Sequence, residues 1–245
     1  MSTSELYNQG YTILHDVIGH ETCDTLRRNL SSRFGNNLPF NFEPGHYQLK
    51  LPDTMDNLPI EIIMSPTIHK FIQQIFSTNY YMSSLTCNAN LAKKNQPYHM
   101  DCSHFHSTAA MKGFGSVGPP VQLIVNVYLQ DTDEKNGSLE IVPGSHKIVD
   151  FEMNEDGIID EKYVCNSVRC NLSKGSVIIR DKRTWHRGTI NHTDEPRYMV
   201  GSTYTLNWYR LNHLTFHSDT ELFWMTVPFS TWNLEFYKEE SPEKN

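Results

Sequence analysis

The sequence has no long apolar run, no excess of basic residues and no apolar leader. No stretch approaches the roughly 18 consecutive apolar residues that a membrane span needs. The first ten residues, MSTSELYNQG, lack the basic start and apolar block of a secretory signal. Lysine and arginine total 21 against 28 aspartates and glutamates, a net charge of −7, and no basic cluster offers a footprint for nucleic acid. We therefore expect neither a membrane nor a nucleic acid as a partner.

Cysteine is also scarce. The five cysteines are odd in number and form no CxxC pair, and a chain of 245 residues is long enough to build a core without cross-links. They are predicted to be reduced thiols in a cytoplasmic protein. A content of 38% hydrophobic residues, with 12 phenylalanines and 12 tyrosines, indicates a chain that folds.

The first 77 residues are predicted to form a helical flank. Residues 11–17 have the pattern of a short strand, and Ser65 followed by Pro66 predicts the start of a helix, because serine caps helices and proline favours the first helical position. That helix is expected to pack on the outside of a sheet. Between the two segments, after Gly19, apolar residues recur at helical spacings; they are Cys23, Leu26, Leu30 and Phe34.

Residues 78–207 change to short β-type runs separated by turn residues, which favours an antiparallel barrel or jelly roll. The expected strands are 80–92, 96–101, 121–129, 138–142, 162–168, 175–181 and 196–206. The remaining residues, 208–245, form an aromatic extension that is predicted to dock on the barrel or to make a homo-oligomer contact. No linker or internal repeat divides the chain, so residues 1–245 are predicted to form a single domain.

The tripeptide His99-Met100-Asp101 stands out among the twelve histidines. If the segment is a strand, residues i and i+2 project from one face, so an imidazole and a carboxylate converge. Alone, this pattern is weak. His104 and His106 could complete a zinc cluster with it, but strand parity puts them on the opposite face, and a loop is favoured there.

A second histidine, His186, follows the strand-like run GSVIIRD, and Arg197 lies eleven positions later. Two histidines and one carboxylate form a facial triad that binds Fe(II) and leaves positions for a co-substrate and dioxygen. Arg197 is placed to hold the far end of a dicarboxylate through a bidentate, charge-assisted contact.

With these motifs, and with the run NGSLEIVPGSHK between them, the sequence resembles the phytanoyl-CoA dioxygenase-like branch of the Fe(II)/2-oxoglutarate-dependent oxygenases. The resemblance implies a double-stranded β-helix. It implies Fe(II) held by His99, Asp101 and His186, and the 2-oxoglutarate carboxylate bound by Arg197. It also suggests contacts from Gln96 and, more weakly, Asn126 to the co-substrate. Gly188 departs from the family pattern, because many relatives carry a hydroxyl side chain there.

The resemblance further implies that 2-oxoglutarate and dioxygen are consumed, with release of succinate and CO2, to oxidise a C–H bond, by default to a hydroxyl. Asp101 argues against halogenation, since related halogenases replace this carboxylate with a small residue. We expect a compact metabolite and a biosynthetic tailoring step. The alternatives are oxidation of an acyl-CoA thioester and a non-catalytic jelly roll that binds a metal or ligand.

Several neighbouring residues have plainer interpretations. The Gly/Pro-containing stretch 107–120 is a candidate lid, with Met111 and Phe114 as substrate contacts, although an ordinary connection is almost as good an interpretation. Asp181 is expected to pair with its basic neighbours. His146 is predicted as a turn residue.

Overall fold

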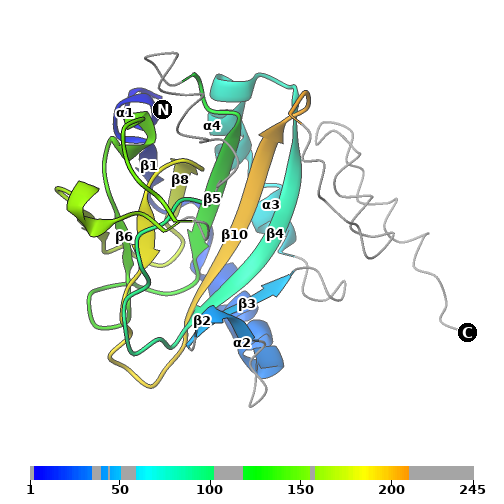
Figure 1. Cartoon of the computed structure of the whole chain (residues 1–245). Coiled ribbons are helices and arrows are strands. Elements are labelled where there is room, and N and C mark those ends of the chain that lie inside the picture. Colours follow the sequence, from blue (N-terminus) through cyan, green and yellow to red (C-terminus); the bar gives the residue numbers. More distant parts are fainter. Residues whose placement is uncertain are drawn as a thin grey trace, which may run out of the picture.

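Two antiparallel sheets make the framework of the computed structural model, which describes residues 3–34, 40–43, 45–50, 59–101, 118–154 and 158–209 (Figure 1). The larger sheet has seven strands in the order β1 (Tyr11–Leu14), β8 (Val177–Asp181), β5 (Gln122–Tyr128), β10 (Arg197–Leu206), β4 (Tyr80–Asn90), β3 (His46–Lys50) and β2 (Phe40–Glu43). The smaller sheet has the order β7 (Val168–Cys170), β6 (Leu139–Ile141) and β9 (His186–Gly188). This mainly β architecture with N-terminal helices confirms the predicted fold class.

Helices cover the outer face of the larger sheet, behind the strands in Figure 1. Ser65 caps α4 (Pro66–Phe76), as the sequence predicts, and its hydroxyl accepts a hydrogen bond from the backbone N–H of Ile68 at 3.5 Å. Both predicted helices are confirmed, because capping and apolar spacing are local signals. The helices are α1 (Ser4–Gln9), α2 (His20–Phe34), α3 (Ile60–Ile63) and α4 (Pro66–Phe76).

A second, smaller core lies between the two sheets. Apolar side chains from β1, β5, β8 and β10 meet those from β6 and β7, so β5 and β8 are buried on both faces. The members are Tyr11, Tyr128, Leu139, Ile141, Cys170, Leu172, Ile178 and Met199. Polar groups placed on this inner face are therefore shielded from water by both sheets.

Two predicted strands are wrong. Residues 96–101 form no regular strand: isolated bridges link His99 to His186 of β9 and to Ile158, and Pro97 within the segment has no N–H to donate to a ladder. Residues 162–168 begin with a 3₁₀ turn (Glu161–Tyr163), because the Asp160 side chain caps it by accepting from the N–H of Lys162. Strands β2 and β3 were not expected from the sequence.

None of the described helices is long and apolar enough to span a bilayer. The cysteines within the described ranges are free, with Cys23, Cys87 and Cys170 buried and Cys165 exposed. Cys102 and most of the aromatic extension, beyond Tyr209, lie outside the described residues.

Candidate metal centre

Three side chains predicted as metal ligands converge at one end of the space between the sheets. The donor atoms of His99, Asp101 and His186 all lie within 4.8 Å of one another. His186 Nε2 is 3.5 Å from Asp101 Oδ2, and His99 Nε2 is 4.0 Å from Oδ1. The backbones of the two histidines exchange two hydrogen bonds of 3.0 Å, which fixes the 99–101 segment beside β9.

Both imidazoles are oriented by backbone carbonyls. His99 Nδ1 lies 2.9 Å from the carbonyl of Pro97, and His186 Nδ1 lies 2.9 Å from the carbonyl of Thr184. A carbonyl oxygen only accepts, so each of these contacts is a hydrogen bond when Nδ1 carries the proton; at His186 the Nη1 atom of Arg180 lies farther from the same Nδ1, at 3.4 Å. Each Nε2 is then left with a lone pair directed at the cluster, which is the tautomer that a metal ligand needs.

Arg180 of β8 is a member of this centre that the sequence analysis did not identify. Its guanidinium forms an ion pair with the Oδ2 atom of Asp101 and is 5% exposed, against 29% for the carboxylate. Its Nε donates to the Asn126 side-chain oxygen at 3.3 Å. The signal in the sequence was an arginine directly after the apolar run VII, on a strand buried along its whole length.

The charges of the centre are strongly coupled. Burial alone would raise the pKa of Asp101, but the neighbouring Arg180, His186 and His99 outweigh it and hold that pKa well below the usual range. Burial, reinforced by Arg180, keeps the pKa of His186 well below that of a free imidazole. An anionic carboxylate beside a neutral imidazole is a donor set suited to a divalent cation.

Two residues predicted to contact a co-substrate have partners within the protein. The side-chain oxygen of Gln96 accepts from the backbone N–H of Gly188 at 2.8 Å, and the Gln96 N–H donates back to the Gly188 carbonyl at 2.9 Å. The side-chain oxygen of Asn126 accepts a hydrogen bond from Arg180 Nε. Their contact with a co-substrate stays a prediction.

Arg197 begins β10 and points into the same interior. It is 3% exposed, and its Nε donates to the carbonyl of Gly137 at 3.3 Å, while its Nη1 has no hydrogen-bond partner. No carboxylate within the described ranges forms an ion pair with it, and burial lowers its pKa. A buried guanidinium with a free end is suited to bind an anionic ligand.

Two further polar atoms near Arg197 are buried without a partner among the described residues: His46 Nε2 and the Tyr128 hydroxyl. Burial lowers the pKa of His46 to about 4, and nearby Arg197 and His99 act in the same direction. Burial raises the pKa of Tyr128. Neither residue was singled out from the sequence, since a lone histidine or tyrosine in a strand carries no motif.

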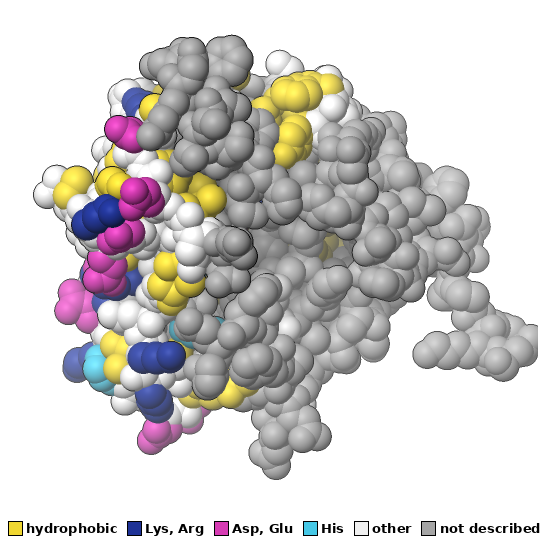
Figure 2. Space-filling model, viewed as in Figure 1, with side chains coloured by type: hydrophobic (Ala, Val, Ile, Leu, Met, Phe, Trp, Pro, Cys, Tyr) yellow, Lys and Arg dark blue, Asp and Glu magenta, His cyan; other side chains and the backbone are white. Residues whose placement is uncertain are grey.

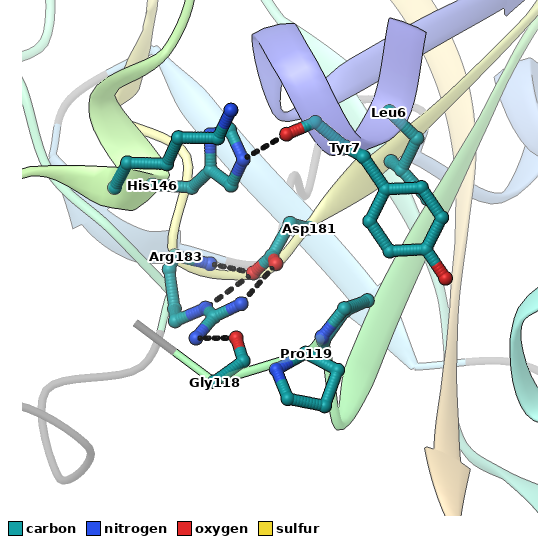
Figure 3. Close-up of a pocket in the computed structure, with 9 residues that line it drawn as sticks. Leu6, Tyr7, Gly118, Pro119, His146, Asp181 and Arg183 are labelled. Atoms are coloured by element: carbon teal, nitrogen blue, oxygen red, sulfur yellow. Dashed lines mark hydrogen bonds and ion pairs between the residues drawn. The ribbon is translucent and has the colours of Figure 1, made fainter. Parts of the chain in front are cut away.

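A cavity of about 240 Å³ lies beside the centre, where α1 meets the end of β8 (Figure 3). Asp181 lines it and is paired with Arg183 at 2.6 Å, as predicted from its basic neighbours. His146 also lines it, buried in a 3₁₀ turn with Nε2 3.2 Å from the Tyr7 carbonyl. Asp181 follows Arg180 directly on the strand, so the two side chains project to opposite faces and the cavity is not the metal centre.

Acidic and basic side chains alternate over the described part of the surface shown in Figure 2. Lys162 pairs with Glu152 at 2.5 Å, and Arg187 pairs with Glu140 at 2.6 Å. The candidate lid residues Met111 and Phe114, together with His104 and His106, lie outside the described residues.

The chain was compared with known families and structures. A sequence profile described as Phytanoyl-CoA dioxygenase (PhyH) matches residues 6–199. The crystal structure of HygX from Streptomyces hygroscopicus, with nickel, 2-oxoglutarate and hygromycin B bound, has a TM-score of 0.65 and 14% identity, over 85% of this chain and 89% of HygX.

Two structures of SnoN, a non-heme α-ketoglutarate-dependent epimerase from nogalamycin biosynthesis, are also similar. The complex with Fe3+, α-ketoglutarate and nogalamycin RO has a TM-score of 0.65 and 18% identity, over 83% of this chain and 81% of SnoN. The other has a TM-score of 0.63 and 19% identity, over 87% and 86% of the respective chains. At these identities the likeness concerns the fold.

Proposed function

Since the chain belongs to the phytanoyl-CoA dioxygenase (PhyH) family, we propose that it is an Fe(II)- and 2-oxoglutarate-dependent oxygenase that hydroxylates a C–H bond of a small metabolite. The observation that carries this proposal is the convergence of His99, Asp101 and His186, with the Nδ1 atom of each imidazole 2.9 Å from a backbone carbonyl. Residues 1–245 would form one catalytic domain.

The metal ligands would be His99 Nε2, His186 Nε2 and the Oδ1 atom of Asp101. The other carboxylate oxygen, Oδ2, is held by Arg180. Because Arg180 is itself fixed by Asn126, the carboxylate is presented in one orientation. Two histidines and one carboxylate leave several coordination positions for other ligands.

Arg197 would bind the distal carboxylate of 2-oxoglutarate. Its partnerless Nη1 and its burial leave a cationic group for which the described residues offer no counter-ion. A dicarboxylate supplies that counter-ion.

When bound, the iron and its co-substrate supply the oxidising power: one dioxygen is consumed, 2-oxoglutarate yields succinate and CO2, and one oxygen atom enters the substrate C–H bond as a hydroxyl. The residues of this chain would hold the metal, orient the bound ligands and shield the site from water. His99 and His186 would donate their Nδ1 protons to backbone carbonyls and bind the metal through Nε2. The two sheets exclude water from the inner face on which Arg180 and Arg197 lie.

A compact metabolite is the substrate class that we favour. The net charge of −7 gives no excess of basic residues for the phosphates of an acyl-CoA thioester. The structures of similar fold include HygX with hygromycin B and SnoN from nogalamycin biosynthesis, which supports a tailoring step in biosynthesis. A cytoplasmic location and a homo-oligomer contact through residues 208–245 stay predictions.

The first experiment measures succinate formed by the Fe(II)-loaded protein with 2-oxoglutarate, ascorbate and oxygen, with and without a panel of candidate metabolites. Asp101→Ala should abolish succinate formation and lower the iron content, because it removes a metal ligand. Asp194→Ala is the matched control, since Asp194 is fully exposed in a surface pair with Lys93.

A substrate that stimulates succinate formation identifies the oxygenase class and begins to name the substrate. Full activity and unchanged iron content in Asp101→Ala would refute the metal site. No succinate from iron-loaded wild-type protein would favour the non-catalytic binding barrel. Product analysis by mass spectrometry distinguishes hydroxylation, a gain of one oxygen atom, from epimerisation, which leaves the mass unchanged. Acyl-CoA oxidation is tested separately, by including an acyl-CoA thioester in the substrate panel.

A further inference from the structure

His46 lies in the same row of the larger sheet as Arg197. His46 of β3 is in register with Asn90 of β4, which is in turn in register with Arg197 of β10. Residues paired across neighbouring strands share a face, so the two side chains lie on the inner face with their backbones two strand spacings, about 10 Å, apart. At this separation both side chains can contact one small anionic group.

Both side chains present a buried nitrogen without a partner. His46 Nε2 and Arg197 Nη1 form no hydrogen bond with any residue that the structure describes. Asn90, between them, does not fill this gap, because its side-chain amide donates to the carbonyl of Thr189 at 2.9 Å. Buried polar atoms are nearly always paired, so two unpaired nitrogens in one row indicate that a ligand from outside the protein binds here.

The absence of a side chain at Gly188 makes room for the imidazole. A Cβ atom built at Gly188 would lie 2.7 Å from His46 Cε1 and 2.6 Å from the side-chain oxygen of Gln96. Gly188 is two residues after His186 on β9, so the His46 ring lies at the edge of the metal centre on the side of Arg197. The low pKa of His46, about 4, keeps the ring neutral at neutral pH, with one N–H available for donation.

We propose that His46 binds the distal carboxylate of 2-oxoglutarate together with Arg197, its Nε2–H donating to one carboxylate oxygen while the guanidinium contacts the other. This inference rests on the proposed function and adds to it a second, neutral donor at the co-substrate site. The partnerless hydroxyl of Tyr128, on the next strand, supports a pocket built for a ligand rich in acceptor atoms.

The test is an anaerobic titration of Fe(II)-loaded protein, with the visible charge-transfer band of the iron-bound 2-oxo acid as the signal. Each variant is titrated with 2-oxoglutarate and with pyruvate, which chelates iron through the same 2-oxo acid group but lacks the distal carboxylate. His46→Leu removes the donor at similar volume, His46→Gln keeps a donor, and His192→Leu changes an exposed histidine as the control.

His46→Leu should weaken 2-oxoglutarate binding by about tenfold to a hundredfold, the effect of one hydrogen bond to a charged group. Pyruvate binding and iron affinity should stay unchanged, and His46→Gln should recover part of the loss. In combination with Arg197→Leu the two losses should be less than additive, because both side chains hold one carboxylate.

An affinity for 2-oxoglutarate within twofold of wild type in His46→Leu would overturn the inference, as would equal weakening of pyruvate and 2-oxoglutarate. Thermal unfolding of each variant identifies a folding defect. If His46→Leu is unstable, His46→Gln decides between the two roles, because a purely structural role of His46 would weaken the binding of 2-oxoglutarate and pyruvate equally. If the wild-type protein gives no band with either acid, the proposed function itself fails.

Discussion

Removing the charge of Arg180 should destabilise the metal-free protein more than the metal-bound protein. Without a metal, this guanidinium is the strongest counter-ion of Asp101, and the pair is shielded between the sheets. Arg180→Met keeps much of the side-chain volume and leaves the carboxylate unpaired. A divalent cation bound by the same carboxylate would replace the missing charge.

The magnitude follows from the burial of the pair. Loss of one partner of a buried ion pair costs about 3–5 kcal/mol, and we take the lower end because the Asp101 carboxylate is 29% exposed. A loss of about 3 kcal/mol corresponds to a fall in Tm of about 6–12 °C for a chain of this size. Addition of Mn(II) at about a hundred times its Kd contributes about 2.7 kcal/mol to a folded protein, and the gain should be larger in Arg180→Met, where the ion also neutralises Asp101.

The assay is thermal unfolding followed by circular dichroism, with EDTA and then with excess Mn(II). Arg183→Met is the control, because Arg183 and Asp181 form an ion pair outside the metal centre that is buried on both sides, at 6% and 3% exposure. It should lower Tm by at least as much and gain no extra stability from the metal. The reasoning is refuted if Mn(II) raises the Tm of Arg180→Met by no more than that of wild type, or if the metal-free variant is as stable as wild type.

Two further predictions concern stability. Gly175 has φ +82°, and a Cβ there would clash with the carbonyl oxygen of Ile18, so Gly175→Ala should lower the unfolding free energy by more than about 1 kcal/mol in urea titrations. Gly19→Ala should cost less, because a Cβ there meets only the Thr22 hydroxyl, at an ordinary contact distance of 3.9 Å. Burial lowers the pKa of His69, whose Nδ1 lies 2.8 Å from the Tyr80 hydroxyl. Below about pH 6.5 the unfolded chain therefore binds a proton that the folded protein excludes. As the pH falls through this range, this histidine lowers the stability of the fold by up to about 1.4 kcal/mol per pH unit. His69→Asn should cost more stability at pH 7.5 than at pH 5.5, and an equal cost at both would contradict this assignment.

Sequence reasoning reached the metal-ligand triad by a partly wrong route. Alternation along a strand suggested that His99 and Asp101 share a face, yet residues 96–101 form no regular strand. A bridge to His186, across 87 positions (186 − 99), brings the side chains together instead. The spacing of His99 and Asp101 was informative because the same spacing occurs in the family that the sequence resembles. The backbone conformation that brings the two side chains together depends on a distant partner, His186.

Arg180 and His46 show why the rest of the site was not predicted. A buried arginine is tolerated only with a counter-ion, and Asp101 lies 79 residues away in the chain. His46 shares a row with Arg197 only because β3 pairs with β4 and β4 with β10 in one register. A shift of one residue would turn His46 to the other face of the sheet.

The sequence by itself determined the elements whose causes are local: the cap at Ser65, the apolar face of α2, and the buried strands β5 and β8. These depend on residues within a few positions of one another, so a pattern in the chain records them. Only the tertiary structure decided which polar side chains meet on the inner face, because strand order and register come from long-range pairing. The counter-ion of Asp101 and the partnerless nitrogens of His46 and Arg197 in one row of the sheet follow from that pairing alone.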